Sequence, residues 1–269
     1  MNVPPGNSGK LDRLVGRSAF GADATGYHDA RSGYPDELFT HLARLATSGP
    51  RIFEIGAGTG LATQGLLTLG PSRLTVIEPD PRLCQFLQGR FSSSNSEVVC
   101  GTFPDTDVEG QFDLIACAAA FHWMEPVSAL AKIRSILAPD GTWAMWWNCY
   151  FGHAEPDPFG ECVLRILEAH EVLLPPSYAG RRHYSLDVEH HVGQLEQCGF
   201  REVRHRIFRN QKELDASQAR ALYQSFSFIR VLEESTRKSI LDEIGLLVDA
   251  DFGGRARMKV VTSFFSAKP

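Results

Sequence analysis

The chain has 269 residues, a formal net charge of −5, 43% hydrophobic residues and 22% charged residues. This balance is ordinary for a globular protein, and the negative charge argues against binding to nucleic acid or another polyanion. No apolar run approaches the ~18–20 residues that cross a bilayer, and residues 1–6 lack a signal-peptide pattern, so we expect a cytoplasmic protein without a membrane partner.

Helix and strand patterns alternate along residues 35–150. Apolar residues recur at helical spacing in residues 35–48, whereas residues 112–118 form a continuous apolar run, typical of a strand buried on both faces. The other expected helices are residues 61–69, 81–90 and 125–137, and the other expected strands are residues 51–55, 73–78, 97–100 and 142–148. This alternation predicts an α/β fold with a doubly wound, mostly parallel sheet, which binds ligands beyond the carboxyl ends of its strands.

Beyond residue 150 the pattern loosens. Helices are expected at residues 159–174, 187–198, 216–231 and 233–250, and strands at residues 202–208 and 257–265. We therefore divide the chain into three parts. They are an N-terminal lid segment at residues 1–34, a ligand-binding core at residues 35–150, and residues 151–269, which complete a seven-stranded sheet and add a helical cap.

The most informative motif lies between the first strand and the helix that follows it. There Gly56, Gly58 and Gly60 stand at alternate positions, so the backbone can turn sharply and approach a ligand closely. A dinucleotide site of the dehydrogenase type would need its third glycine one residue later, where Leu61 stands. Glu54 would repel a pyrophosphate, but it could pair with an ammonium group or hold a nearby loop. A glycine-rich turn without a ligand is the alternative interpretation.

A second acid, Glu78, ends the next apolar strand. An acid at that place in a βαβ unit can accept hydrogen bonds from both hydroxyls of a ribose. Asp80 is instead placed to cap the helix that begins at Pro81. We therefore assign ligand binding to Glu78 and helix capping to Asp80.

Glu54 and the three glycines resemble the cofactor loop of class I S-adenosylmethionine-dependent methyltransferases, whose pattern is (D/E)-x-G-x-G-x-G, and Glu78 stands where that family has its ribose-binding acid. Residues 27–35 are similar to the Y-x-x-x-R-x-x-Y-P opening of the subgroup related to trans-aconitate methyltransferase, and residues 120–123 resemble its A-x-H-W signature. Residues 137–142 resemble the family's L-x-P-G-G turn, with Asp140 in place of the first glycine. Residues 101–105 depart from the family's G-x-(A/F)-E-x-L-P, because the usual acid is missing.

This resemblance implies a Rossmann-like methyltransferase fold, the cofactor S-adenosyl-L-methionine and the product S-adenosyl-L-homocysteine. The implied cofactor-binding residues are Tyr27, Arg31, Glu54, Gly56, Ala57, Gly58, Gly60, Thr63, Glu78, Pro79, Thr102, Phe103 and Ala118.

The acceptor site is less constrained than the cofactor site. A sulfonium already activates the methyl group, so the protein has to position a nucleophile and exclude water, without a metal. His122 is the candidate catalytic residue: it acts as a base for a hydroxyl or a neutral amine, or it only orients the substrate. The expected substrate-binding residues are His122, Trp147, Tyr178, Arg182 and Tyr184. Residues 178–184 form a basic and aromatic cluster that suits a carboxylate, or else a solvated loop.

We accordingly predict methyl transfer to a small-molecule or short-peptide acceptor, with O-methylation of a carboxylate or hydroxyl in secondary metabolism as the leading interpretation. The alternatives are N- or C-methylation on the same fold, and a non-catalytic cofactor-binding accessory protein. We expect a monomer or a homodimer. The six cysteines form no C-x-x-C pair, which predicts reduced thiols and no metal site.

Overall fold

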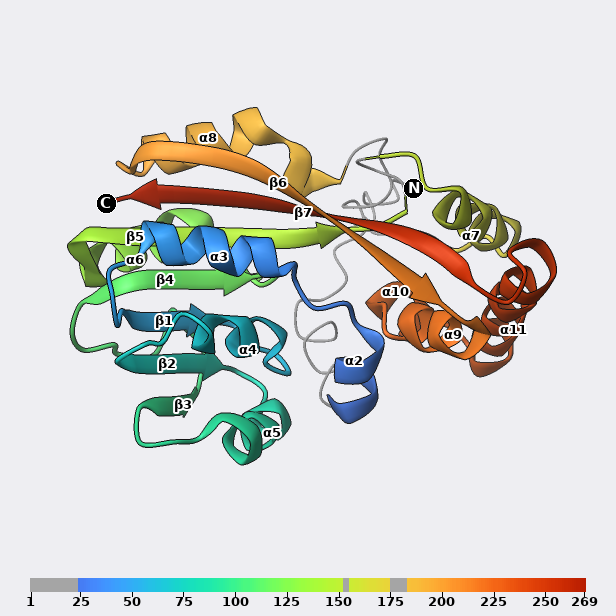
Figure 1. Cartoon of the computed structure of the whole chain (residues 1–269), viewed down its shortest axis with the longest axis horizontal. Coiled ribbons are helices and arrows are strands. Elements are labelled where there is room, and N and C mark those ends of the chain that lie inside the picture. The colour runs from blue at the N-terminus through green and yellow to red at the C-terminus, as the bar shows by residue number, and fades with distance from the viewer. Residues whose placement is uncertain (1–23, 152–154, 175–182) are drawn as a thin grey trace, which may run out of the picture.

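A single sheet organises the chain, as the computed structural model in Figure 1 shows. The structure describes residues 24–151, 155–174 and 183–269. Within these ranges the sheet has seven strands in the order β3-β2-β1-β4-β5-β7-β6. The strands are β1 (Arg51–Ile55), β2 (Arg73–Glu78), β3 (Ser96–Cys100), β4 (Phe112–Ala118), β5 (Leu137–Cys149), β6 (Arg201–Leu214) and β7 (Ala256–Lys268).

The sheet is mostly parallel, as predicted. Strands β1 to β5 run parallel to their neighbours, whereas β7 is antiparallel to both β5 and β6. The helices are α2 (Ala24–Ala30), α3 (Asp36–Leu45), α4 (Leu61–Leu67), α5 (Pro81–Phe91), α6 (Pro126–Ile136), α7 (Pro158–Ala169), α8 (Val188–Gln197), α9 (Ala216–Gln224), α10 (Ser227–Arg230) and α11 (Glu234–Asp251). The doubly wound α/β fold with a seven-stranded sheet is therefore confirmed.

Helices cover both faces of the sheet. One apolar cluster joins buried residues of α3, α4 and α5 to one face, and another joins α6 and α8 to the opposite face. Strand β5 shows the alternation that this burial requires: Trp143 and Trp147 belong to the second cluster and Trp146 to the first. Because both faces are buried, the central strands read as continuous apolar runs.

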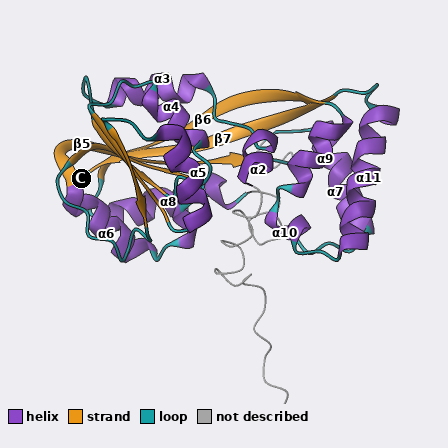
Figure 2. Ribbon diagram, turned by 90° about the horizontal axis from the view of Figure 1, so that it is seen from below, coloured by secondary structure: helices purple, strands orange, loops and turns teal. Residues whose placement is uncertain are grey.

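A helical cap stands beyond one end of the sheet. Strands β6 and β7 continue past their neighbours and connect through α9, α10 and α11, and α7 packs against this group (Figures 1 and 2). The cap has its own apolar core, to which Tyr150 and Phe151 contribute just after β5. The cap therefore lies next to the carboxyl end of β5, and helix α2 lies between the cap and the sheet.

Several local expectations differ from the structure. Residues 139–141, expected as a turn, lie inside β5, where the pairing with β4 shifts register and leaves Pro139 and Asp140 exposed. The helix expected at residues 216–231 divides into α9 and α10, because Phe226 adopts an extended backbone. Strand β6 runs to Leu214, since its extension pairs with β7 rather than with the rest of the sheet.

The expectation of reduced thiols is wrong for one pair of cysteines. Cys84 of α5 and Cys100 at the end of β3 form a disulfide. They are 16 residues apart in sequence, and the packing of α5 beside β3 brings them together. Spacing alone does not reveal such a contact.

Candidate active site

A large pocket opens where the parallel strands end. Its volume is about 650 Å³, within the ~300–1,000 Å³ range of small-molecule sites. The loops after β1, β2, β3, β4 and β5 all contribute to its wall, together with the segment before α3 and the turn between α9 and α10. This is the edge at which the glycine motif and Glu78 are predicted to meet.

The glycine loop has a backbone that requires glycine at each of its three positions. The φ angles of Gly56, Gly58 and Gly60 are 70°, 60° and 82°, all in the left-handed region. A Cβ at Gly56 would lie 2.5 Å from Cβ of Ala120, and one at Gly60 would lie 2.2 Å from the ring of Phe91. At Gly58, by contrast, nothing lies within 4 Å of the Cβ position. The middle of the loop therefore faces open space on the pocket side.

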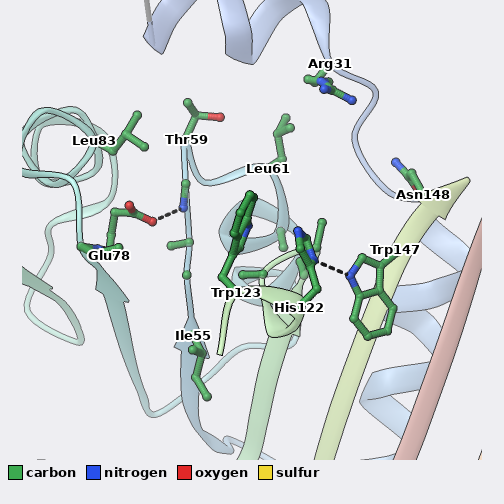
Figure 3. Close-up of a pocket in the computed structure, with 18 of the residues that line it drawn as sticks. Arg31, Ile55, Thr59, Leu61, Glu78, Leu83, His122, Trp123, Trp147 and Asn148 are labelled. Carbon is green, nitrogen blue, oxygen red and sulfur yellow. Dashed lines mark hydrogen bonds between the residues drawn. The ribbon is translucent and has the colours of Figure 1, made fainter. Parts of the chain in front are cut away.

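Glu78 holds the glycine loop in place. Its Oε2 accepts a hydrogen bond of 2.8 Å from the backbone N–H of Gly58, and its Oε1 accepts one of 3.0 Å from the N–H of Asp80. Figure 3 shows the bond to the loop. Asp80 caps α5 as predicted, since its side chain accepts from the N–H of Arg82 and also forms an ion pair with it. The two neighbouring acids thus have separate roles in the structure.

Glu54 lies beneath the loop rather than on the pocket wall. It is 1% exposed, and its Oε2 accepts a bond of 2.6 Å from the hydroxyl of Thr63, whereas Oε1 has no hydrogen-bond partner among the described residues. Burial, with a smaller contribution from the charge of Glu78, raises the pKa of Glu54 to about 8, against the opposing effect of the Thr63 hydroxyl. At neutral pH the carboxyl is therefore mostly protonated.

The loop after β3 forms the next part of the wall. Phe103 is buried and packs on Phe53. The ammonium of Lys132 donates hydrogen bonds of 2.6–3.1 Å to the backbone carbonyls of Phe103, Pro104 and Thr106. Thr102 bonds through its hydroxyl to Asp105. Lys132 thus stabilises this short loop, although the acid usual at this place is missing.

His122 stands in a short helical turn, η2 (Phe121–Trp123), just past β4. The buried ring of Phe121 packs against Trp143 and anchors the turn, while His122 itself is exposed. Its Nδ1 lies 3.2 Å from the indole nitrogen of Trp147 and 3.1 Å from the hydroxyl of Tyr184. In Figure 3 the imidazole rises into the pocket between Trp123 and Trp147.

Helix α2 and the residues after it close one side of the pocket. Nδ1 of His28 lies 3.2 Å from the hydroxyl of Thr59 in the glycine loop. The guanidinium of Arg31 donates to the carbonyl of Ser225 and lies 4.0 Å from the ring centre of Phe226 in the cap. Asn148 donates from Nδ2 to the carbonyl of Ser32 at 3.3 Å. The segment therefore touches the loop, the cap and the end of β5 at once.

Most of the predicted site residues meet in this pocket. Those that line it are Tyr27, Arg31, Gly56, Ala57, Gly58, Glu78, Pro79, Thr102, Phe103, Ala118, His122, Trp147 and Tyr184. Glu54, Gly60 and Thr63 lie behind its wall. Tyr178 and Arg182 lie outside the described residues, as do Arg181 and residues 1–23 of the expected lid segment.

The pocket also has lining residues that the sequence does not single out, among them Thr59, Leu61, Asn148, Tyr150, Phe226 and Phe228. Asn148 was within reach of sequence reasoning, because it ends a predicted strand at the edge that carries the site. Phe226 and Phe228 gave no signal, since they fall inside a single expected helix and reach the pocket only because that helix breaks.

The contacts of α2 lead to a prediction about closure. His28 contacts the glycine loop and Arg31 contacts the cap, and the loop and the cap both line the pocket. A ligand that touches the loop and the cap should therefore slow the opening of residues 24–34. We expect hydrogen exchange of residues 24–34 to slow when S-adenosylhomocysteine binds. Helix α3 is the internal control, since Leu38 and Leu42 are fully buried and its protection should not change. Equal exchange of residues 24–34 in both states would rule out a lid.

Among the described ranges, no helix combines the length and apolar character needed to span a bilayer. The same ranges contain no group of three or more histidine, cysteine, aspartate or glutamate residues placed to hold a metal ion.

Comparison with known proteins finds similarity to methyltransferases in sequence and in structure. Residues 53–145 match the methyltransferase domain family. An uncharacterized methyltransferase-like protein of Schizosaccharomyces pombe is 28% identical over 231 residues, which cover 84% of this chain and 85% of that protein. A structure assigned as a type II methyltransferase from Anaeromyxobacter dehalogenans has a TM-score of 0.63 at 18% identity, over 88% of this chain and 96% of that chain. Phosphoethanolamine N-methyltransferase 2 of Haemonchus contortus, solved with phosphomonomethylethanolamine and S-adenosylhomocysteine, has a TM-score of 0.52 at 12% identity, over 96% of this chain and 58% of that chain.

Proposed function

Since the chain is a class I S-adenosylmethionine-dependent methyltransferase, we propose that it transfers the methyl group to an oxygen atom of a small-molecule or short-peptide acceptor, a carboxylate or a hydroxyl, in secondary metabolism. The observation that carries this proposal is the continuity of the pocket: Glu78 and the glycine loop lie at one end and His122 at the other. The narrower likeness to the trans-aconitate methyltransferase subgroup stays a prediction.

The residues at the glycine-loop end fit the cofactor. Gly58 leaves open space where a side chain would intrude, and Glu78 offers carboxylate oxygens at the pocket wall for the ribose hydroxyls. Oε1 of Glu54, beneath the loop, is a buried oxygen without a partner among the described residues, and an ammonium group that came close to it would favour the ionised form of this carboxyl. When bound there, the cofactor supplies a methyl group that its sulfonium has already activated.

The residues at the other end enclose an acceptor of limited size. Aromatic side chains from four separate segments form this part of the wall, namely Trp123, Trp147, Tyr150, Tyr184, Phe226 and Phe228. They provide apolar surface beside His122, and Arg31, stacked on Phe226, adds a positive charge at the rim. A bulky macromolecular acceptor would have to displace α2 and the turn between α9 and α10.

Two measurements test this proposal. Calorimetry should show binding of S-adenosylmethionine and S-adenosylhomocysteine but not of NAD, because the third glycine lies too early for a dinucleotide. Incubation with methyl-labelled cofactor and a small-molecule extract should then give a labelled product that mass spectrometry identifies as an ester or ether. Tight NAD binding without binding of either sulfur nucleoside, or a labelled product methylated at nitrogen or carbon, would reject the proposal.

A further inference from the structure

A lysine of α6 holds the loop that follows β3. The ammonium of Lys132 donates hydrogen bonds of 2.7, 3.1 and 2.6 Å to the backbone carbonyls of Phe103, Pro104 and Thr106. An ammonium group has three N–H donors and no acceptor, so these bonds use its full capacity. Because the three carbonyls converge on one ammonium, it restrains all of them together against α6.

Helix α6 gives this contact a firm support. Leu130 and Ile133, on either side of Lys132, are fully buried in the apolar cluster that covers one face of the sheet. The ammonium also lies 5.0 Å from the ring centre of Phe103, and that ring packs on Phe53 of β1 with 5.8 Å between ring centres. The lysine therefore connects the loop to two elements of the core, α6 and β1.

The loop itself is a compact turn. The carbonyl of Thr102 accepts from the N–H groups of Asp105 and Thr106 at 3.2 and 3.1 Å. A Cβ on Gly101 would lie 2.6 Å from the hydroxyl oxygen of Thr106, so the two ends of the turn lie against each other. At its start, the N–H of Gly101 donates to the carbonyl of Glu78 at 3.0 Å. The turn is thus tied to the end of β2 on one side and to α6 on the other.

The order of the strands indicates which end of the cofactor meets this loop. Glu78 ends β2, and in the sheet β3 lies on one side of β2 while β1 and β4 lie on the other. The methyl group has to face the acceptor end, where His122 stands just past β4. The base and the sulfur are attached at opposite ends of the ribose. With the ribose at Glu78, we therefore expect the base beside the loop after β3, where Thr102 and Phe103 line the pocket.

We propose that Lys132 is the positioning residue for the adenine of the cofactor: by holding residues 102–106 against α6, it sets the part of the wall on which the base rests. This inference rests on the cofactor site proposed above and adds to it a residue from a different element. Lys132 acts through the loop and does not itself touch the base. Its loss should therefore affect only ligands that carry the base.

Ligands with and without the base test this proposal. S-adenosylhomocysteine and 5′-methylthioadenosine carry adenine, whereas S-ribosylhomocysteine has the ribose and the amino acid without adenine. Lys132→Met keeps the apolar stem of the side chain and removes the ammonium. It should weaken the binding of both adenine compounds by about 10-fold, the scale of one hydrogen bond to a charged group, and leave the binding of S-ribosylhomocysteine unchanged. Calorimetry gives the affinities, and circular dichroism checks the fold.

Lys268→Met is the matched control. The ammonium of Lys268 also donates to a backbone carbonyl, that of Asp140, at 2.7 Å, and to the hydroxyl of Thr142, but these residues are not part of the pocket wall. This variant should bind all three ligands as the wild type does. Equal losses for S-ribosylhomocysteine and S-adenosylhomocysteine in Lys132→Met, or no loss for either, would overturn the proposal.

A second variant and a measurement on the wild-type protein support the first test. Lys132→Arg keeps the charge but spreads its donors over a planar fork, so it should show the same dependence on the base. In the wild-type protein, 5′-methylthioadenosine should slow hydrogen exchange of residues 101–106, and S-ribosylhomocysteine at equal occupancy should not. Equal exchange with the two ligands would place the base elsewhere and reject the inference.

Turnover with the acceptor found in the labelling experiment separates positioning from general damage. Lys132→Met should raise KM for S-adenosylmethionine and leave kcat and the KM of the acceptor near their wild-type values, because saturating cofactor occupies the loop again. A fall in kcat with an unchanged KM for the cofactor would contradict the role of Lys132. If the wild-type protein bound neither sulfur nucleoside, the proposed function would fail; normal binding without a loss that depends on the base would remove only the role of Lys132.

Discussion

Replacement of Glu78 by alanine should weaken the binding of S-adenosylhomocysteine by about 1.5–3 kcal/mol, roughly 10- to 150-fold. Glu78 presents its carboxylate at the pocket wall and also holds the N–H of Gly58 at 2.8 Å, so the variant loses a ligand contact and a loop contact together. Calorimetry with the nucleoside gives the affinity, and circular dichroism checks that the sheet is intact.

Asp80→Ala is the matched control for this experiment. Asp80 is two residues away, also a carboxylic acid and also buried, but its carboxylate caps α5 and pairs with Arg82. This variant should lose stability, by about 1 kcal/mol for the helix cap, and keep most of its cofactor affinity. Unchanged affinity in Glu78→Ala together with lost affinity in Asp80→Ala would mean that the two roles are assigned the wrong way round.

Replacement of Glu54 by glutamine should remove a pH dependence of stability. The pKa of Glu54 is about 8 in the folded protein, against 4.5 for an unperturbed glutamate, so the folded state holds a proton that the unfolded state releases. The free energy of unfolding of the wild-type protein therefore falls as pH rises from about 4.5 to about 8, because the unfolded state binds fewer protons in that window. Glutamine does not ionise, and its amide oxygen can still accept from Thr63.

The expected size of this effect follows from the slope of about 1.4 kcal/mol per pH unit. Between pH 5.5 and pH 7.5 the stability of Glu54→Gln relative to the wild type should rise by about 2–3 kcal/mol, measured by urea unfolding without cofactor. Glu109→Gln, at an exposed position on the loop before β4, should follow the wild-type profile. If the free energy of unfolding of Glu54→Gln and of the wild type changed with pH in parallel, Glu54 would not hold a proton in the folded protein at neutral pH.

Much of the fold follows from local sequence patterns. The strands that run parallel at the centre, β1, β2 and β4, lie where mainly apolar runs predict them, because strands buried on both faces leave few polar positions. The ends of strands were predicted less well where pairing with a neighbouring strand sets the length of the strand. Strand β6 extends to Leu214 because β7 continues beside it, and no pattern in residues 209–214 indicates this.

The cofactor end of the site was also within reach of the sequence. Gly56, Gly58 and Glu78 are close in sequence to the strands that carry them, so the spacing of the motif already places them at one edge of the sheet. The acceptor end was not. Phe226 reaches the pocket because α9 stops and the chain adopts an extended backbone, with its ring against Arg31, a residue 195 positions earlier. Helix periodicity contains no information about such a contact.

The sequence by itself determined the order of strands and helices, the glycine loop and the acid that faces it, because each depends on residues within one strand–helix unit. Only the tertiary structure decided the burial of Glu54 and the hydrogen-bond contacts of His122 and His183. The first depends on how completely the surrounding elements exclude water. The second depends on which donor reaches Nδ1: an indole from β5 for His122, and for His183 the backbone N–H of Ser185, in the turn that packs beside β5.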